Sequence, residues 1–135
     1  MDFKLKDGEV VRTVLAVKAS ATVIEAGDLV ALSSGLIVKA GAADTAVAYA
    51  PNGAGDGETL IDVTVGNDFT LIGTGDAAFA ATDRGSLADI AISGSAQQID
   101  VSASSTNVLK VGISQDSGTV GSAANIEVRI DKPLF

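Results

Sequence analysis

The stretch TLIDVTVGNDFTLIG, residues 59–73, decides the fold expected for this chain. From 61 to 65 every second side chain is Ile or Val, and the side chains between them include Asp and Thr. Such period-two alternation is typical of a β-strand with one buried and one solvated face. The residues at 66–68 (Gly-Asn-Asp) separate this run from a second apolar run at 69–73, and Gly and Asn tolerate a positive φ. The stretch therefore predicts two antiparallel strands joined by a hairpin loop.

Short β-rich runs of this kind recur along the whole chain. They lie at 9–17, 21–26, 29–32, 36–40, 45–50, 59–65, 69–73, 98–103, 107–114 and 125–130. A second hairpin loop is indicated at 33–35 (Ser-Ser-Gly). Parallel strands need crossovers of a dozen or more residues, for which the first half of the chain has no room. We predict an all-β fold: a compact antiparallel β-barrel or sandwich of short strands, with at most one or two short helices and an extended N-terminal arm.

The residues at 73–78, Gly-Thr-Gly-Asp-Ala-Ala, match the G-x-G-x-x-A pattern of a dinucleotide-binding turn. That turn works at the start of a long helix in a parallel βαβ unit. Here Asp76 can cap only an Ala-rich segment that Gly85 ends after about two turns. We interpret the match as a coincidence of spacing. The glycines are expected to let the chain leave the barrel wall and place Phe79 in the core or on a neighbouring subunit.

The composition favours a role without catalysis. The chain contains no cysteine and no histidine, which removes disulfides, thiolate and imidazole metal ligands, Cys nucleophiles and His bases. The glycine-rich loop at 53–57 lacks the Lys-Ser/Thr of a P-loop, and no spaced Asp pattern of a calcium loop is present. We therefore predict a protein that is not an enzyme, with no catalytic residues, no cofactor and no metal site. An enzyme or a carbohydrate-binding module remains an alternative, because all-β folds host such sites.

The charge is negative and unevenly distributed. The formal net charge is −8, and residues 40–83 contain seven acidic residues and no basic one. Such a surface repels phosphate backbones, so no nucleic-acid partner is expected. No apolar run approaches the length that crosses a membrane, and the N-terminus lacks the apolar region of a signal peptide. We expect a protein that is made in the cytoplasm and not exported by a signal of its own, with no membrane partner.

Both ends of the chain carry candidate contact residues. Residues 1–8 are predicted to form an arm that alternates apolar with basic side chains, namely Phe3, Lys4, Leu5 and Lys6. The arm either adds a strand to the sheet edge of another chain or stays disordered. At the other end, Leu134 and Phe135 either plug the barrel or dock on a neighbouring subunit.

A resemblance to a known family rests on residues 25–53, EAGDLVALSSGLIVKAGAADTAVAYAPNG. This segment is similar to the opening of the small β-rich capsid decoration proteins of tailed bacteriophages. In those, a G-D-x-V strand leads through an S-x-G turn into a strand, and the next strand ends near A-P-N-G. The run IDVTVGNDFTL at 61–71 resembles their hairpin. The resemblance covers roughly residues 25–80. Because 84–125 match less well, the single domain at 9–135 is either the simplest form of the fold or one with an added outer lobe at 84–125.

The resemblance implies a viral structural protein that stabilises the head. Such proteins are typically trimers on the outside of the mature capsid, where they hold neighbouring capsomers together. The implied partners are the major capsid protein and further copies of this chain, and the implied location is the virion. Phe3 to Lys6 would then contact the capsid, and Phe79, Leu134 and Phe135 would contact other subunits. The alternative is another phage structural or adhesion module, such as a fibre, tail or spike component.

Overall fold

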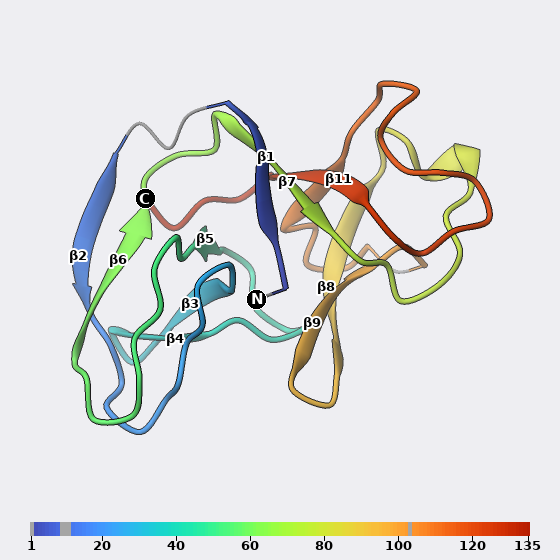
Figure 1. The fold of residues 1–135 in the computed structure, drawn as a ribbon. Helices are drawn as coiled ribbons and strands as arrows, with labels where there is room; N and C mark the ends of the chain where they lie inside the picture. The colour runs from blue at the N-terminus through green and yellow to red at the C-terminus, as the bar shows by residue number, and fades with distance from the viewer. Residues whose placement is uncertain (1, 9–11, 103) are drawn as a thin grey trace.

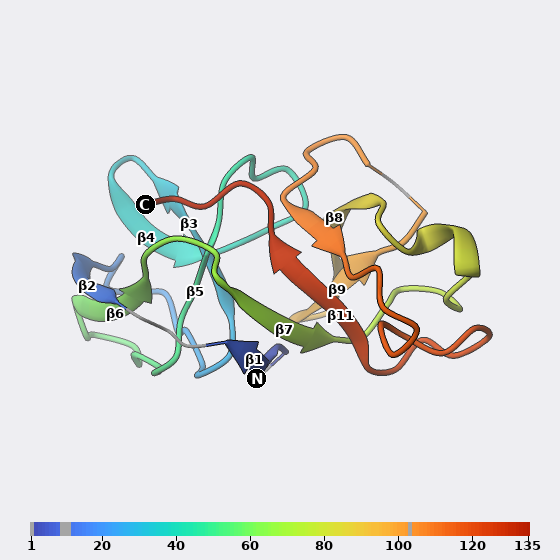
Figure 2. The same cartoon turned by 90° about the horizontal axis from the view of Figure 1, so that it is seen from above.

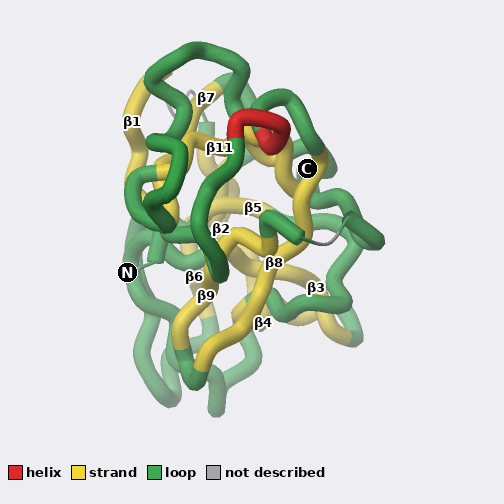
Figure 3. The backbone as a smooth tube through the Cα atoms, turned by 90° about the vertical axis from the view of Figure 1, so that its right-hand side faces the viewer, coloured by secondary structure: helices red, strands yellow, loops and turns green. Residues whose placement is uncertain are grey.

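The computed structural model describes the chain except residues 1, 9–11 and 103, and it is built almost entirely from short strands (Figure 1). The strands are β1 (Lys4–Gly8), β2 (Thr13–Val17), β3 (Leu29–Ser33), β4 (Leu36–Lys39), β5 (Ala48–Tyr49), β6 (Leu60–Thr64), β7 (Phe69–Gly73), β8 (Leu87–Ser93), β9 (Ala96–Asp100), β10 (Leu109–Val111) and β11 (Ile126–Ile130). The only helix among the described residues is a 3-10 turn, η1 (Ala81–Asp83), drawn red in Figure 3. The predicted all-β class is confirmed.

The strands form three antiparallel sheets. The largest has the order β1-β7-β11-β10-β8-β9, and two smaller sheets have the orders β2-β6 and β4-β3-β5. Figure 1 shows the smaller sheets on the left, and β8, β9 and β11 with their loops on the right. Within the described residues no sheet closes into a barrel, because each order has two ends. Of the two predicted architectures, the structure is compatible with a sandwich of open sheets.

Two adjoining hydrophobic clusters make up the core. The larger lies between the six-stranded sheet and strands β3 and β5, and it contains Phe3, Phe69 and Phe79 together with aliphatic side chains from β8 to β11. The smaller cluster lies between the two smaller sheets, and its members are Ile24, Val30, Ile37, Ala48, Ala50, Ala54, Ile61 and Val63. The chain therefore folds around two centres of unequal size.

One predicted hairpin is confirmed and the other is wrong. β3 and β4 pair through a two-residue turn in which Ser34 and Gly35 have φ of 51° and 78°. In contrast, β6 pairs with β2, whereas β7 pairs with β1 and β11. The reason lies in the connecting loop: the Gly66 N–H donates to the Phe135 carbonyl, and the Asn67 amide donates to the Ile130 carbonyl. The C-terminal segment thus holds this loop and directs the chain from one sheet into another.

The region after β7 also differs from the prediction. No helix of two turns follows Asp76; a single 3-10 turn forms, and the Asp83 carboxylate accepts a hydrogen bond from the Ala80 N–H at 2.8 Å. The next residues form β8, a strand that the periodicity does not reveal, because its inner and outer positions both include small or aliphatic residues. β8 pairs with β9 through a two-residue turn at Gly94, which has a φ of 63°.

The remaining strand predictions are confirmed to different extents. The run at 21–26 forms only an isolated bridge between Ile24 and Ala54. The start of the predicted strand at 9–17 (residues 9–11) and the end of the predicted strand at 98–103 (residue 103) lie outside the described residues. From the segment 84–125, β8, β9 and β10 belong to the same sheet as β7 and β11, and the loops at 74–86 and 112–125 gather at one end of the molecule (Figure 2).

The N-terminal residues differ most from their predicted form. As far as they are described, they are no extended arm, because β1 pairs along β7 of its own chain with a bulge between Leu5 and Asp7. Phe3 is fully buried in the larger cluster. An ideal Cβ at Gly73 would lie 2.6 Å from the Phe3 ring, so Phe3 fills the space that this glycine leaves. Burying the ring favours intrachain pairing over an arm in solvent.

Candidate interaction surfaces

The glycine turn at 73–78 is a packing feature. An ideal Cβ at Gly75 would lie 2.7 Å from Ile126 Cδ1, just as one at Gly73 would meet Phe3. The N–H groups of the turn are also engaged: Gly75 donates to the Ala123 carbonyl at 2.7 Å, and Asp76 donates to the Ile99 carbonyl at 2.9 Å. A dinucleotide site needs free N–H groups at this place. The glycines instead let neighbouring side chains approach the backbone.

The predicted contact residues fall into a buried and an exposed group. Phe79 is expected either in the core or on a neighbouring subunit, and in the structure it is buried in the core. Its ring packs against Gly118 and lies 5.4 Å from the Arg84 guanidinium carbon. Phe3 is buried in the same cluster. Neither ring is accessible to a second protein in this structure.

Four predicted contact residues lie at or near the surface. Lys4 and Leu5 are exposed on β1, at the edge of the six-stranded sheet. Lys6 pairs with the carboxylate of Glu127 on β11. Phe135 is half exposed.

Leu134 is intermediate between the buried and the exposed group. It is half-buried against the smaller cluster, and its N–H donates to the Val47 carbonyl at 3.0 Å. Since no barrel is closed, Leu134 covers the end of the smaller cluster instead of plugging a barrel.

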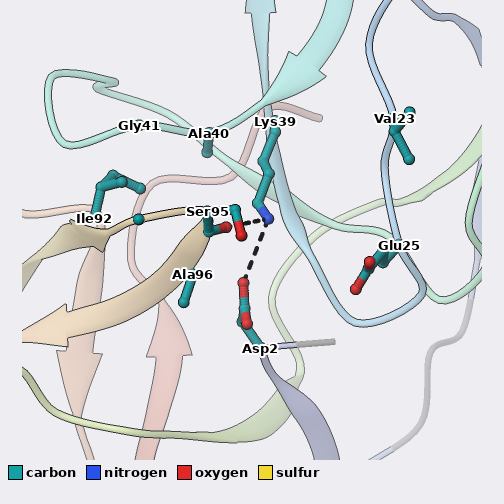
Figure 4. Close-up of a pocket in the computed structure, with 10 residues that line it drawn as sticks. Asp2, Val23, Glu25, Lys39, Ala40, Gly41, Ile92, Ser95 and Ala96 are labelled. Atoms are coloured by element: carbon teal, nitrogen blue, oxygen red, sulfur yellow. Dashed lines mark hydrogen bonds and ion pairs between the residues drawn. The ribbon is translucent and has the colours of Figure 1, made fainter. Parts of the chain in front are cut away.

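A cavity of about 490 Å³ lies where the N-terminus, the β3–β4 hairpin and the β8–β9 hairpin meet (Figure 4). Lys39 stands at its centre and donates to the Ser95 carbonyl at 2.7 Å. The same ammonium lies 3.5 Å from carboxylate oxygens of both Asp2 and Asp28. These contacts join three segments that are remote in sequence. The polar side chains here therefore connect the three-stranded sheet to the six-stranded sheet.

A buried glutamine reinforces this junction. Gln97 on β9 accepts a hydrogen bond from the Leu29 N–H at 2.9 Å, and its amide donates to the Leu29 and Ala40 carbonyls at 2.8 Å each. Its own N–H donates to Asp2. Sequence reasoning missed this residue, because nothing local distinguishes Gln97 from its neighbour Gln98. The alternation of β9, which places Gln97 on the inner face with Ile99, was the one available signal.

Asp89 on β8 organises the loop before β10. Its two carboxylate oxygens accept hydrogen bonds from the N–H groups of Ser105, Thr106 and Asn107 and from the Ser105 hydroxyl, at 2.8 to 3.0 Å. Burial by itself raises the pKa of this carboxyl, but the hydrogen bonds from Asn107 and Ser105 outweigh it and lower the pKa to about 2. The group is therefore a structural anion at neutral pH.

A hydroxyl–carboxylate chain lines a groove of about 420 Å³ on the outer side of the large sheet. Ser114 Oγ lies 3.2 Å from Ser117 Oγ, and Ser117 donates to Glu127 Oε2 at 3.3 Å. Glu127 is the carboxylate that pairs with Lys6. The chain of contacts holds the loop at 112–118 on the sheet, where Gly112 leaves room for Ser117.

The same groove is bordered by two cations. Lys110 on β10 lies directly opposite Arg129 on β11, and both are exposed. Within the described residues neither cation has an ion pair or hydrogen bond. Leu87, opposite Lys110 on β8, is 38% exposed, and Ile113 in the adjoining loop is 78% exposed. We call Leu87, Lys110, Ile113 and Arg129 the basic face.

A second exposed face lies on the two-stranded sheet. Leu15 and Val17 on β2 stand opposite Asp62 and Leu60 on β6, so these four side chains share one side of the sheet. The three apolar ones are 51 to 64% exposed. Asp62 has no ion pair within the described residues. We call this set the acidic face, and Figure 1 shows its strands at the end opposite to the loops at 112–125.

Comparisons with protein-family models, with curated proteins and with solved structures find no match to this chain. Among the described residues, no helix has the length and apolar character needed to cross a membrane. The same residues contain no cluster of three or more acidic side chains placed to hold a metal ion.

Proposed function

We propose that this chain is a viral structural protein that binds the outside of the mature capsid as a homotrimer and stabilises the contacts between capsomers. The observation that carries the proposal is the pair of exposed faces with apolar centres on a small, strongly acidic β-domain. Contiguous exposed apolar side chains mark interaction surfaces more often than catalytic ones. The resemblance of residues 25–80 to capsid decoration proteins supports the same function.

The shell contact in this proposal lies on β1. β1 forms one end of the six-stranded sheet, and its outer edge has no partner strand within the described residues. Such an edge accepts a strand from another protein through main-chain hydrogen bonds. Lys4 and Leu5, both exposed here, supply a positive charge and an apolar contact. In this proposal the edge of β1, instead of an extended arm, contacts the major capsid protein on the virion exterior.

Many weak contacts suffice for such a protein. Three copies held together and bound at several points gain avidity, because each contact after the first forms within one complex. A protein of this kind needs no reacting groups, which agrees with a chain that contains neither histidine nor cysteine.

Co-sedimentation with expanded capsids that lack their decoration protein tests the function. We expect saturable binding of the wild-type protein, and weaker binding of L5D, which places a carboxylate on the exposed β1 edge. D68K, on an exposed loop residue, is the control and is expected to bind like the wild type. Absence of wild-type protein from the capsid pellet at any concentration would refute the function.

A further inference from the structure

The basic face is unusual because its cations are unmatched. Of the nine basic residues of the chain, five are engaged within it: Lys6, Lys18, Lys39, Arg84 and Lys132. Lys110 and Arg129, in contrast, face each other across β10 and β11 and form no ion pair or hydrogen bond among the described residues, while Glu127 in the same groove is paired with Lys6. Like charges directly opposite in a sheet are destabilising. A negatively charged group from outside the chain would relieve this repulsion.

The acidic face has the complementary composition. Leu15, Val17 and Leu60 surround Asp62, which likewise lacks an ion pair among the described residues. Glu58, exposed just before β6, adds a second negative charge at its border. The basic face combines cations with the exposed side chains of Leu87 and Ile113. Each face thus offers apolar contacts and the charge that the other one needs.

We propose that the basic face of one copy binds the acidic face of a second copy, in a head-to-tail contact between Lys110/Arg129 and Asp62. The strands that carry the two faces, β2 and β6 for one and β8 and β11 for the other, lie toward opposite ends of the molecule, as Figures 1 and 2 show from two directions. A contact between different patches at opposite ends repeats from copy to copy and produces a ring when the rotation closes. That the ring contains three copies rests on the function proposed above.

The charges also exclude the simplest alternative, a symmetric contact of a face with itself. Such a contact would bring the two Asp62 carboxylates together on one face, or four cations together on the other. Like charges placed against each other across an interface are strongly unfavourable. The head-to-tail arrangement converts both repulsions into attractions and covers the apolar residues of both faces in the same step.

A charge exchange followed by mass measurement tests the contact. Native mass spectrometry and sedimentation equilibrium of the wild type should give three times the 13.4 kDa of the chain. K110E/R129E and D62K should each raise the dissociation constant of the trimer by about tenfold or more, since an unpaired interface charge costs upwards of about 1.4 kcal/mol. The triple variant D62K/K110E/R129E should restore the trimer, because every contact then has complementary charges again.

Two controls separate the contact from general charge effects. K4E, on β1, and D68K reverse a charge outside both faces, and both should keep the wild-type mass. The restored trimer of the triple variant excludes misfolding as the cause of dissociation, and K110Q/R129Q provides a milder test with an intermediate effect. A monomeric wild type, an undisturbed K110E/R129E trimer or a triple variant that stays monomeric would each overturn the contact.

The result is distinguishable from that of the capsid experiment. If the wild type decorates capsids but the charge exchange leaves its mass unchanged, the contact is wrong and the function stands. If the exchange dissociates and restores the trimer while no copy binds capsids, the function is wrong and the contact stands.

Discussion

The molecule has two halves, the six-stranded sheet and the pair of smaller sheets, and they differ in the side chains that fill their cores. The larger cluster contains the buried rings Phe3, Tyr49, Phe69 and Phe79. The smaller cluster has no aromatic side chain among its described members, and three of its eight buried residues are alanine. Aromatic side chains bury the largest areas and dominate core energetics. The six-stranded half is therefore expected to carry most of the stability, and the smaller half to serve the presentation of β2 and β6.

Both halves leave large apolar side chains exposed, and three of those in the smaller half lie on β2 and β6. β2 and β6 form a two-stranded sheet, which is marginal by itself and gains its support from Val14, Ala16, Ile61 and Val63 on its inner side. Its outer side leaves three aliphatic residues half exposed or more. The acidic face of the proposed contact thus lies on the half whose cluster has no aromatic side chain among its described members, whereas β1 and the basic face lie on the six-stranded sheet.

The largest effect is expected at the N-terminus. F3A removes a fully buried ring and should lower the free energy of unfolding by about 3–5 kcal/mol. L5A, on the same strand but 42% exposed, should cost less than about 1 kcal/mol. Urea titrations followed by circular dichroism measure both. Equal and small effects would mean that residues 2–8 form an arm in solution instead of a strand of the larger half.

The next largest effect concerns the connection between the halves. Q97L keeps the size of the side chain but leaves the Leu29 N–H and the Leu29 and Ala40 carbonyls without this partner, which should cost about 3 kcal/mol. Q98L, at the neighbouring position, is the matched control and should change the stability by at most about 0.5 kcal/mol. Hydrogen exchange would locate the change: the β3–β4 amides should lose protection first, and a loss confined to β9 would contradict the junction.

The sequence predicts the strands well and their pairing poorly. Period-two alternation locates β6 and β7 because each of them buries one face, and Ser34-Gly35 identifies its hairpin because the turn requires positive φ. The loop at 66–68 has similar residues but does not join a hairpin, because the Phe135 carbonyl and the Ile130 carbonyl hold it from a distant part of the chain. Partners remote in sequence decide sheet order, and no local pattern contains them.

The candidate surfaces also depend on strand pairing that no local sequence pattern contains. The sequence predicts Phe79 in the core or on a neighbour, and the distinction depends on the nearby Arg84 and on Gly118, which lies three strands further along the chain. Asp62 and Leu15 are unremarkable in sequence, and only the β2–β6 register places them side by side. Lys110 and Arg129 likewise meet only through the pairing of β10 and β11. The members of a face are set by the strand register, so the composition of an acidic chain predicts neither these members nor the charge of the basic face.

A smaller effect, with a defined pH dependence, is expected for Asp89. Its pKa is lowered from 3.8 to about 2, so its contribution to stability is fully present above pH 3.8 and is lost as the pH falls toward about 2. D89N should therefore cost about 2 kcal/mol at pH 7, where charged hydrogen bonds to the loop are replaced. Urea titrations from pH 7 down to pH 2 should show the difference between D89N and the wild type shrinking in the acid range. A difference that is independent of pH would assign the effect to geometry instead of charge.

The smallest effect on stability is expected on the acidic face, together with a clear effect on association. L15T replaces a side chain that is 64% exposed on β2 with a β-branched one suited to strands, so the free energy of unfolding should change by at most about 0.5 kcal/mol. In the proposed trimer the same side chain is covered, and its loss should raise the dissociation constant about tenfold, because burying a leucine contributes on the order of 1.5 kcal/mol or more. L36T, at a leucine that is 38% exposed on β4 outside both faces, should change neither quantity appreciably. A leucine that contributes to association and not to folding belongs to a surface that binds a partner. Equal effects of L15T and L36T would mean that the acidic face is not part of the contact.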